Sequence, residues 1–193
     1  MFISAANSQA QSNFYWNGSA NANWADATQW NLLVVTNGVT NLVNGGDWPG
    51  DQGDSNDADP GHDYAWFTNS GTFNVSVASP ISSYFYIGSN MFDNASGTVM
   101  NVSINIGSGI TFRTGAGDAF VVGESSSSTS IVSVTTSGGA LDTGYSSSTL
   151  YVGRNGYGVL YVTNTQAIAV GGGNWSLGFP ICTPASERTP ANL

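Results

Sequence analysis

The chain has 193 residues, enough for one domain with a sizeable hydrophobic core. Only 8% of its residues are charged, and twelve Asp or Glu outweigh three Arg, with no Lys, for a formal net charge of -9. Such a surface repels phosphate groups, which excludes nucleic acid and anionic membranes as expected partners, and no apolar stretch is long enough to predict a transmembrane segment.

The residue pattern predicts an all-β protein. Apolar residues come in short runs rich in Val, Ile, Phe and Tyr, separated by Gly, Ser, Thr and Asn, whereas good helix formers are scarce. Residues 1–13 precede these runs. Small residues at Ser8 and Ala10 resemble a signal-peptide cleavage region, so this segment is interpreted either as the remnant of a secretory leader or as a disordered polar tail.

Residues 14–67 form a segment rich in Trp and Asp. It holds five of the six Trp residues, for which two roles are open. They could cap the N-terminal end of the domain core, or they could form a sugar-stacking platform, with Trp48 and Trp66 as candidate carbohydrate-binding residues. Core packing is the commoner use of Trp and is favoured. The five residues are Trp16, Trp24, Trp30, Trp48 and Trp66.

An acidic run in the same segment is a candidate calcium site. Alternating oxygen ligands around a turn-forming Gly61 suit Ca²⁺, and crowded carboxylates repel one another unless neutralised. The run D-A-D-P-G-H-D departs from an EF-hand loop, so a solvated acidic loop is the alternative. The candidate ligands are Asp51, Asp54, Asp57, Asp59 and Asp63.

Residues 68–178 repeat one phrase. Its four versions are YFYIGSN (84–90), AFVVGES (119–125), TLYVGRN (149–155) and NWSLGFP (174–180), aligned on Gly88, Gly123, Gly153 and Gly178. The residue before each glycine, and the one two positions earlier, are large and apolar, so both are predicted to point inward. The inward residues of the phrases are Phe85, Ile87, Phe120, Val122, Leu150, Val152, Trp175 and Leu177.

Two further strands accompany the phrases. The second strand is TFNVSV, TVMNVSI, SIVSV or VLYV, and its predicted inward residues are Val75, Val77, Val102, Ile104, Val132, Val134, Leu160 and Val162. The third strand is ITF (110–112), ALD (140–142) or AIAV (167–170). Three strands per repeat predict a triangular parallel β-solenoid. Asn155-Gly156 is a strong hairpin signal, which leaves an antiparallel β-sandwich as the alternative; in the solenoid this dipeptide becomes a corner.

The N-terminal motifs carry a family resemblance. Trp-x-Gly at Trp16, later Trp-Pro, and Asp-x-Ala-x-Phe (63–67) followed by GTFNVSV resemble the start of bacterial autotransporter-passenger-like proteins. The stretch LYVGRNGYGVLYVTNTQAIAVGGG looks like one of their autotransporter-associated β-strand repeats. The resemblance implies a secreted, right-handed parallel β-helix displayed at, or released from, a cell surface.

The pattern stops after Gly178, and residues 179–193 form a polar tail interrupted by Pro180, Pro184 and Pro190. Such a tail is a poor cap, so the last turn is expected to offer unpaired backbone groups to another chain, and the ends could stack into filaments.

The expected role is non-enzymatic. Polysaccharide hydrolysis needs two carboxylates about 5–10 Å apart. Asp118, Glu124 and Asp142 recur near adjacent turns, but solvated corner charges explain them more simply. We therefore expect a secreted or cell-surface structural, adhesive or self-assembling protein, with no cofactor except calcium. A carbohydrate-binding or polysaccharide-cleaving module is the alternative, using the Trp-rich end or the outer face near Asp118 and Asp142.

Overall fold

The computed structural model of the chain describes residues 12–18, 20–44, 46–50, 63–81, 84–95, 97–115, 117–126, 128–143, 148–163, 168–169 and 175–177. This part of the chain is all-β, as predicted, apart from a single 3₁₀ turn, η1 (Ala27–Gln29). Among these residues, no helix has the length and apolar character needed to cross a membrane.

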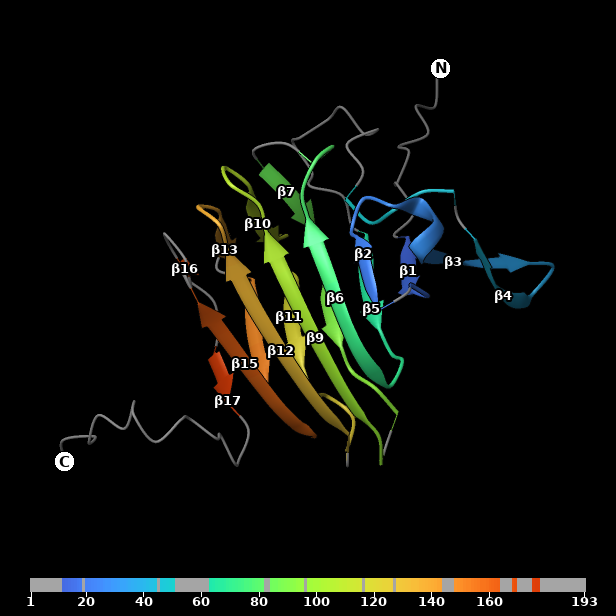
Figure 1. Cartoon of the computed structure of the whole chain (residues 1–193). Helices are drawn as coiled ribbons and strands as arrows, with labels where there is room; N and C mark the ends of the chain where they lie inside the picture. The colour runs from blue at the N-terminus through green and yellow to red at the C-terminus, as the bar shows by residue number, and fades with distance from the viewer. Residues whose placement is uncertain are drawn as a thin grey trace, which may run out of the picture.

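Within the described ranges, seventeen strands form three sheets (Figure 1). The eight-stranded sheet contains β1 (Asn13–Trp16), β3 (Trp30–Thr36), β4 (Val39–Asn44), β5 (Tyr64–Phe67), β8 (Asn90–Phe92), β11 (Ala119–Val122), β14 (Thr149–Val152) and β17 (Trp175–Leu177). The five-stranded sheet contains β2 (Asn21–Asn23), β6 (Gly71–Val77), β9 (Val99–Ile106), β12 (Thr129–Thr136) and β15 (Tyr157–Thr163). The four-stranded sheet contains β7 (Tyr84–Ile87), β10 (Thr111–Thr114), β13 (Ala140–Asp142) and β16 (Ile168–Ala169).

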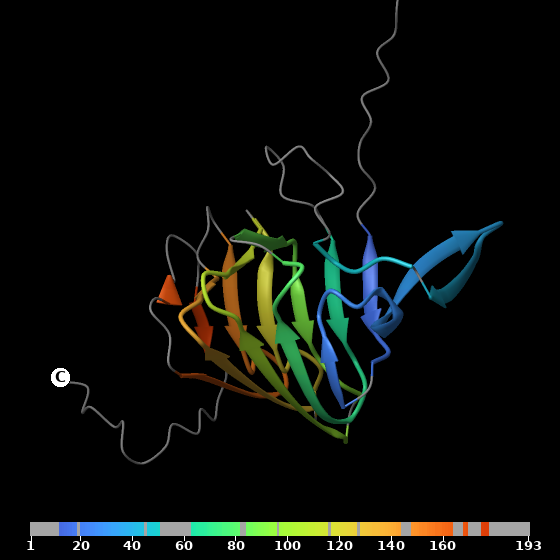
Figure 2. The same cartoon turned by 45° about the horizontal axis from the view of Figure 1, so that its top comes forward.

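From β5 onward the chain visits the three sheets in a fixed rotation. Each circuit adds one strand to the eight-stranded, then the five-stranded, then the four-stranded sheet, and every new strand lies parallel to its predecessor (Figure 2). Paired positions in the eight-stranded sheet are Ala65, Asn90, Phe120, Leu150 and Trp175. Antiparallel pairing among the described strands is confined to β1–β3 and β3–β4, which does not fit the antiparallel sandwich.

Asn155-Gly156 lies between β14 and β15, which belong to different sheets. The dipeptide therefore connects strands of two different sheets and does not turn a hairpin. Two consecutive described strands that do form a hairpin are β3 and β4, where Asn37 and Gly38 have φ values of 53° and 76°. Positive φ at both central residues is the signature of a type I′ turn.

The inward residues of the second strand are confirmed. Val75, Val102 and Val132 are at most 1% exposed, because side chains alternate along a strand and this set faces the interior. Equivalent residues stack on one another: Val75 pairs with Ile104, and Ile104 pairs with Val134. Each circuit thus covers the apolar side chains of the one before.

The alignment of the first phrase is wrong. YFYIGSN supplies β7, whose Phe85 pairs with Phe112 of the four-stranded sheet. The strand that pairs with AFVV of β11 is β8, where Asn90 stands opposite Phe120. The two strands are easily confused in the sequence, because each contains a Phe at its second position and each is followed by a glycine. The phrases at β11, β14 and β17 are aligned as predicted.

A cluster of Trp rings fills the core at the N-terminal end. Trp16, Trp24 and Trp30 are at most 2% exposed, and Trp48 is 9% exposed. The Trp16 ring stacks on Phe67 at 5.2 Å between centroids, and Phe67 stacks on Phe92 at 4.9 Å, so the cluster continues into the next circuit. These four Trp residues therefore pack in the core. The segment also joins the parallel sheets directly: β1, which begins at Asn13, pairs in parallel with β5, β2 pairs with β6, and β5 pairs with β8.

Candidate functional site

The outer face of the five-stranded sheet carries a regular array of small polar side chains. Strands β6, β9 and β12 bury every second residue, so the intervening residues point outward. Across the strands, Asn74 pairs with Ser103 and Ser103 with Ser133. We call this array the polar ladder; it comprises Asn21, Asn74, Ser76, Asn101, Ser103, Asn105, Ser133, Thr135 and Thr163, none of them charged or buried.

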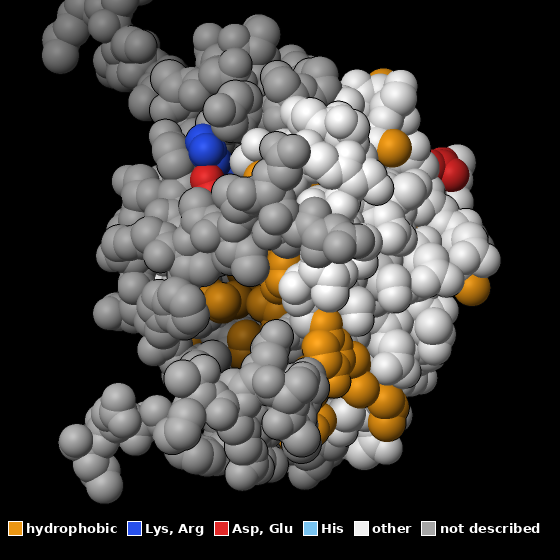
Figure 3. All heavy atoms as spheres, turned by 60° about the vertical axis from the view of Figure 1, so that its left-hand side comes forward, with side chains coloured by type: hydrophobic (Ala, Val, Ile, Leu, Met, Phe, Trp, Pro, Cys, Tyr) orange, Lys and Arg blue, Asp and Glu red, His pale blue; other side chains and the backbone are white. Residues whose placement is uncertain are grey.

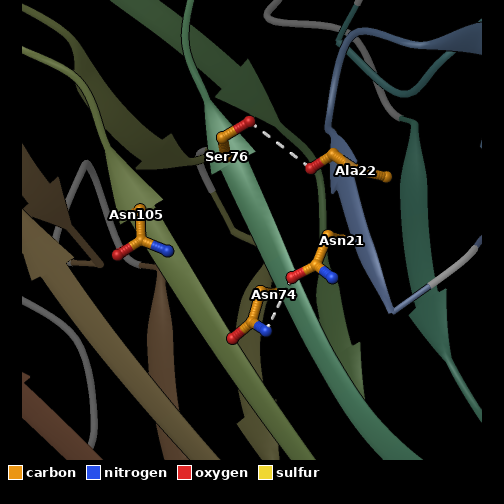
Figure 4. A pocket seen from close by; sticks show the side chains of 5 residues that line it. All are labelled: Asn21, Ala22, Asn74, Ser76 and Asn105. Atoms are coloured by element: carbon orange, nitrogen blue, oxygen red, sulfur yellow. Dashed lines mark hydrogen bonds between the residues drawn. The ribbon is translucent and has the colours of Figure 1, made fainter.

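An open groove of about 370 Å³ lies at one end of the polar ladder (Figure 4). It is lined by Asn21, Ala22, Asn74, Ser76 and Asn105, from β2, β6 and β9. The Asn74 side-chain amide donates to Asn21 Oδ1 at 2.9 Å, which fixes both amides across the strands. The Ser76 hydroxyl points toward the Ala22 carbonyl at 3.4 Å.

The chemistry of this groove suits an uncharged, hydroxyl-rich ligand. Asn side chains offer both a donor N–H₂ and an acceptor carbonyl, and Ser adds a hydroxyl that does either. No lining residue titrates near neutral pH, so the hydrogen-bonding capacity of the groove does not depend on pH. The groove has no cation to bind an anion, and the chain's net charge of -9 disfavours one further.

A second feature lies on the outer face of the eight-stranded sheet. Tyr15 of β1 and Trp66 of β5 are adjacent in register, and their rings stack at 5.8 Å between centroids with an interplanar angle of 9°. Trp66 Nε1 donates to Asn13 Oδ1 at 3.0 Å, which holds the indole in place. Both residues are half-buried, so this stacked pair, which we call the aromatic platform, is partly accessible.

The two Trp residues predicted to bind carbohydrate therefore occupy different environments. Trp66 belongs to the outer aromatic platform, whereas Trp48 belongs to the buried core cluster. Only Trp66 presents a partly accessible ring. Sequence alone did not separate them, because the alternation that turns Ala65 and Phe67 inward and Trp66 outward depends on the register of β5.

Most of the predicted calcium ligands lie outside the described residues: Asp51, Asp54, Asp57 and Asp59. The fifth, Asp63, accepts a hydrogen bond through Oδ2 from the Gly50 amide at 3.0 Å. Within the described ranges, no group of three or more His, Cys, Asp or Glu side chains is placed to hold a metal ion. Calcium binding by the acidic run stays a prediction.

The three carboxylates considered for catalysis contact separate partners. Asp142 forms an ion pair with Arg113 at 2.6 Å, and Glu124 accepts from Arg154 Nε at 3.0 Å. Asp118 accepts from the Ser89 hydroxyl at 3.1 Å. Asp118 and Glu124 lie at opposite ends of β11, while Asp142 lies in the four-stranded sheet.

These contacts affect two neighbouring ionisable groups. Burial raises the pKa of the Tyr64 hydroxyl, and the negative charge of Asp118 raises it further, so Tyr64 stays protonated at neutral pH. The hydrogen bond to Glu124 raises the pKa of the Arg154 guanidinium. Arg154 also lies 4.4 Å from the centroid of the Tyr151 ring. The Arg113–Asp142 pair therefore links neighbouring strands of the four-stranded sheet, and the Arg154–Glu124 pair links the segments that follow β14 and β11.

Among the described side chains visible in Figure 3, few are charged, and hydrophobic ones gather near the middle of the view. A basic group visible there lies against an acidic one. This distribution agrees with a chain in which few charges are present and Arg113 and Arg154 are paired.

The polar ladder was missed by the sequence reasoning, although the signal was present. In TFNVSV, VMNVSINI and SIVSVTT, Asn, Ser and Thr alternate with the inward residues, so period two already placed them on one face.

Comparison with protein-family models, with curated proteins and with solved structures finds no match to this chain.

Proposed function

We propose that the chain is a right-handed parallel β-helix with a structural, adhesive or self-assembling role outside the cell, at a bacterial surface or in its matrix. Support comes from the fixed rotation of parallel strands through three sheets and from the resemblance of the N-terminal motifs to autotransporter-passenger-like proteins. A rod built in this way presents the same outer face many times, which suits multivalent adhesion.

One observation carries the self-assembling part of the proposal. In β15, the outermost strand of the five-stranded sheet, the inward residues Leu160 and Val162 are only partly buried. Their counterparts one circuit earlier, Val132 and Val134, are 0% exposed. The apolar core thus reaches solvent at β15, beside one row of backbone groups that pair with no described strand.

A second copy stacked on this end would cover both features. It would bury Leu160 and Val162 and would satisfy the open backbone groups of β15 with a further parallel strand. Because this contact joins one end to the opposite end, it repeats without closing and gives filaments.

Wild-type protein is expected to form polymers whose mass rises with concentration. Replacing Leu160 with Gln should reduce polymer mass by more than about tenfold, because an amide would have to be buried at the contact. Static light scattering measures the effect. Tyr161→Gln is the matched control, since Tyr161 faces outward on the same strand and is 40% exposed. Circular dichroism verifies that both variants fold; a strictly monomeric wild-type protein at high concentration contradicts the proposal.

The aromatic platform supports a second candidate function, carbohydrate binding. The faces of Tyr15 and Trp66 are nearly parallel, and a flat aromatic surface suits the apolar face of a pyranose ring. Asn13, bound to the Trp66 indole, adds an amide at the edge of the platform. The polar groove on the five-stranded sheet offers further amides for hydroxyl groups.

On a glycan array, Trp66→Ala is expected to abolish binding, because it removes half of the stacking surface, and thermal melting should show a nearly unchanged fold. Trp66→Phe should retain part of the signal. Trp48→Ala is no substitute for this test, because its buried ring stabilises the core. An array without any signal from the wild-type protein removes this candidate and leaves the structural role.

A further inference from the structure

The β3–β4 hairpin projects from the body of the protein (Figures 1 and 2). It has two strands in register, with Leu33 opposite Leu42 and Leu32 opposite Val43. Only the start of β3 is anchored in the sheet, through its antiparallel pairing with β1. The rest of the hairpin extends beyond the core.

Both faces of the hairpin expose apolar side chains. The exposed fractions are 65% for Val35, 59% for Val39, 52% for Leu42 and 43% for Val43, which are four of the six most exposed large hydrophobic residues in the described part of the chain. Leu42 lies on one face and Val43 on the other. A two-stranded ribbon open on both faces is marginally stable in water, and a clustered apolar surface marks an interaction site.

The free edge of the hairpin lacks the usual protection. Strand β4 is the last strand of the eight-stranded sheet, so one row of its N–H and C=O groups is not paired with a described strand. Soluble proteins guard such edges with charged residues, proline or a bulge. Residues 27–46 contain no charged residue and no proline, and the β3–β4 register runs without a bulge.

We propose that β4 pairs antiparallel with β4 of a second copy, about a two-fold axis at Leu42. The closing pair of a two-residue hairpin, here Thr36 and Val39, exchanges hydrogen bonds, so Thr40, Leu42 and Asn44 direct their backbone groups to the open edge. In this register Leu42 faces its own counterpart, and Thr40 faces Asn44 of the second copy. The two hairpins become one four-stranded antiparallel sheet.

The absence of charged residues in the hairpin favours contact with a second copy of the chain there. Two chains of net charge -9 repel each other wherever acidic residues meet. The hairpin lies within a twenty-residue stretch without any charge, between Asp26 and Asp47, so a homotypic contact here brings no acids together. The pairing also continues the established eight-stranded sheet across the axis.

The contact is small. Six residues of β4 span about 20 Å, and the surface covered is less than the roughly 800 Å² per partner of a standard interface. We therefore expect a dimer with a dissociation constant in the micromolar range. Because the axis is two-fold, assembly through this contact stops at two copies, unlike stacking of the chain ends.

Sedimentation velocity over about 10–500 μM tests the dimer. In the Leu160→Gln background, in which stacking of the chain ends is suppressed, the protein should shift from monomer to dimer, and adding Leu42→Lys should raise the dissociation constant more than about 100-fold by placing two like charges on the axis. Val99→Lys is the matched control, since Val99 is a 50% exposed residue outside the hairpin. Polymers formed through the chain ends would persist in Leu42→Lys, which separates the two modes of association.

Cross-linking tests the register. In a Cys182→Ser background, oxidation of Leu42→Cys should give disulfide-linked dimers more than about tenfold faster than oxidation of Val39→Cys, because only residue 42 meets itself. Wild-type protein that stays monomeric at about 500 μM, or equal cross-linking at both positions, overturns the proposal. If the hairpin binds a different protein and not a second copy, the purified chain would stay monomeric in both experiments.

Discussion

Replacing Trp24 with alanine is expected to lower the free energy of unfolding by about 3–5 kcal/mol. The side chain is 0% exposed, and its ring contacts those of Trp30, Phe67 and Phe112 at centroid distances of 4.9, 5.8 and 5.3 Å. These partners belong to three separate strands, so a cavity at Trp24 loosens the hairpin strand and two circuits together.

The substitution also removes a buried hydrogen bond. Trp24 Nε1 donates to the Pro49 carbonyl at 3.0 Å, and a buried carbonyl without a donor adds to the cost. Chemical denaturation followed by circular dichroism measures the loss. Trp66→Ala is the control of equal size on the outer face, for which we expect a loss of about 1 kcal/mol or less. Equal losses in the two variants would contradict the assignment of Trp24 to the core.

Replacing Gly158 with alanine is expected to cost about 3 kcal/mol, for a steric reason alone. An added methyl carbon would overlap the Val122 carbonyl oxygen and would lie 2.5 Å from the Gly153 amide nitrogen. Both are backbone atoms, so neither moves aside as a flexible side chain could. The corner between β14 and β15 would have to shift, and with it the pairing of Gly158 with Ser130.

Gly97→Ala separates this steric effect from backbone strain. Gly97 has a φ of 77°, and a methyl group there meets nothing within 4 Å, so its cost is the conformational penalty of about 1–2 kcal/mol. The φ of Gly158 does not lie in this positive range, so an alanine there carries no such conformational penalty. A thermal melt in which Gly158→Ala is no less stable than Gly97→Ala would show that the corner is not packed as closely as described.

The strands could be predicted because apolar and polar residues alternate within each short segment of the sequence. In VMNVSINI, the alternation of apolar and polar residues specifies both the inward residues, such as Val102, and the outward ones, such as Ser103. The assignment of strands to sheets was less secure. Tyr84–Ile87 and Ala119–Val122 have similar composition, and only the pairing of Phe85 with Phe112 distinguishes their sheets.

The hairpin and the outer surfaces could not be predicted from local sequence, because they depend on which strands pair and in which register. Asn37-Gly38 between VVT and VTN was as strong a hairpin signal as Asn155-Gly156, yet only the first makes one. The strands on either side of the two dipeptides pair differently. β3 and β4 pair with each other, whereas β14 pairs with β11 and β15 pairs with β12. The Trp66 platform likewise required the register of β1 against β5, which links residues about fifty positions apart.

The spacing of paired residues has a kinetic consequence. Ala65, Asn90, Phe120 and Leu150 follow one another at short and similar intervals, so each circuit finds its template in the segment synthesised just before it. Loop closure over such intervals is cheap in entropy, and structure can advance from the Trp cluster one circuit at a time. The early circuits of such a chain can therefore become ordered before its last residue has been synthesised.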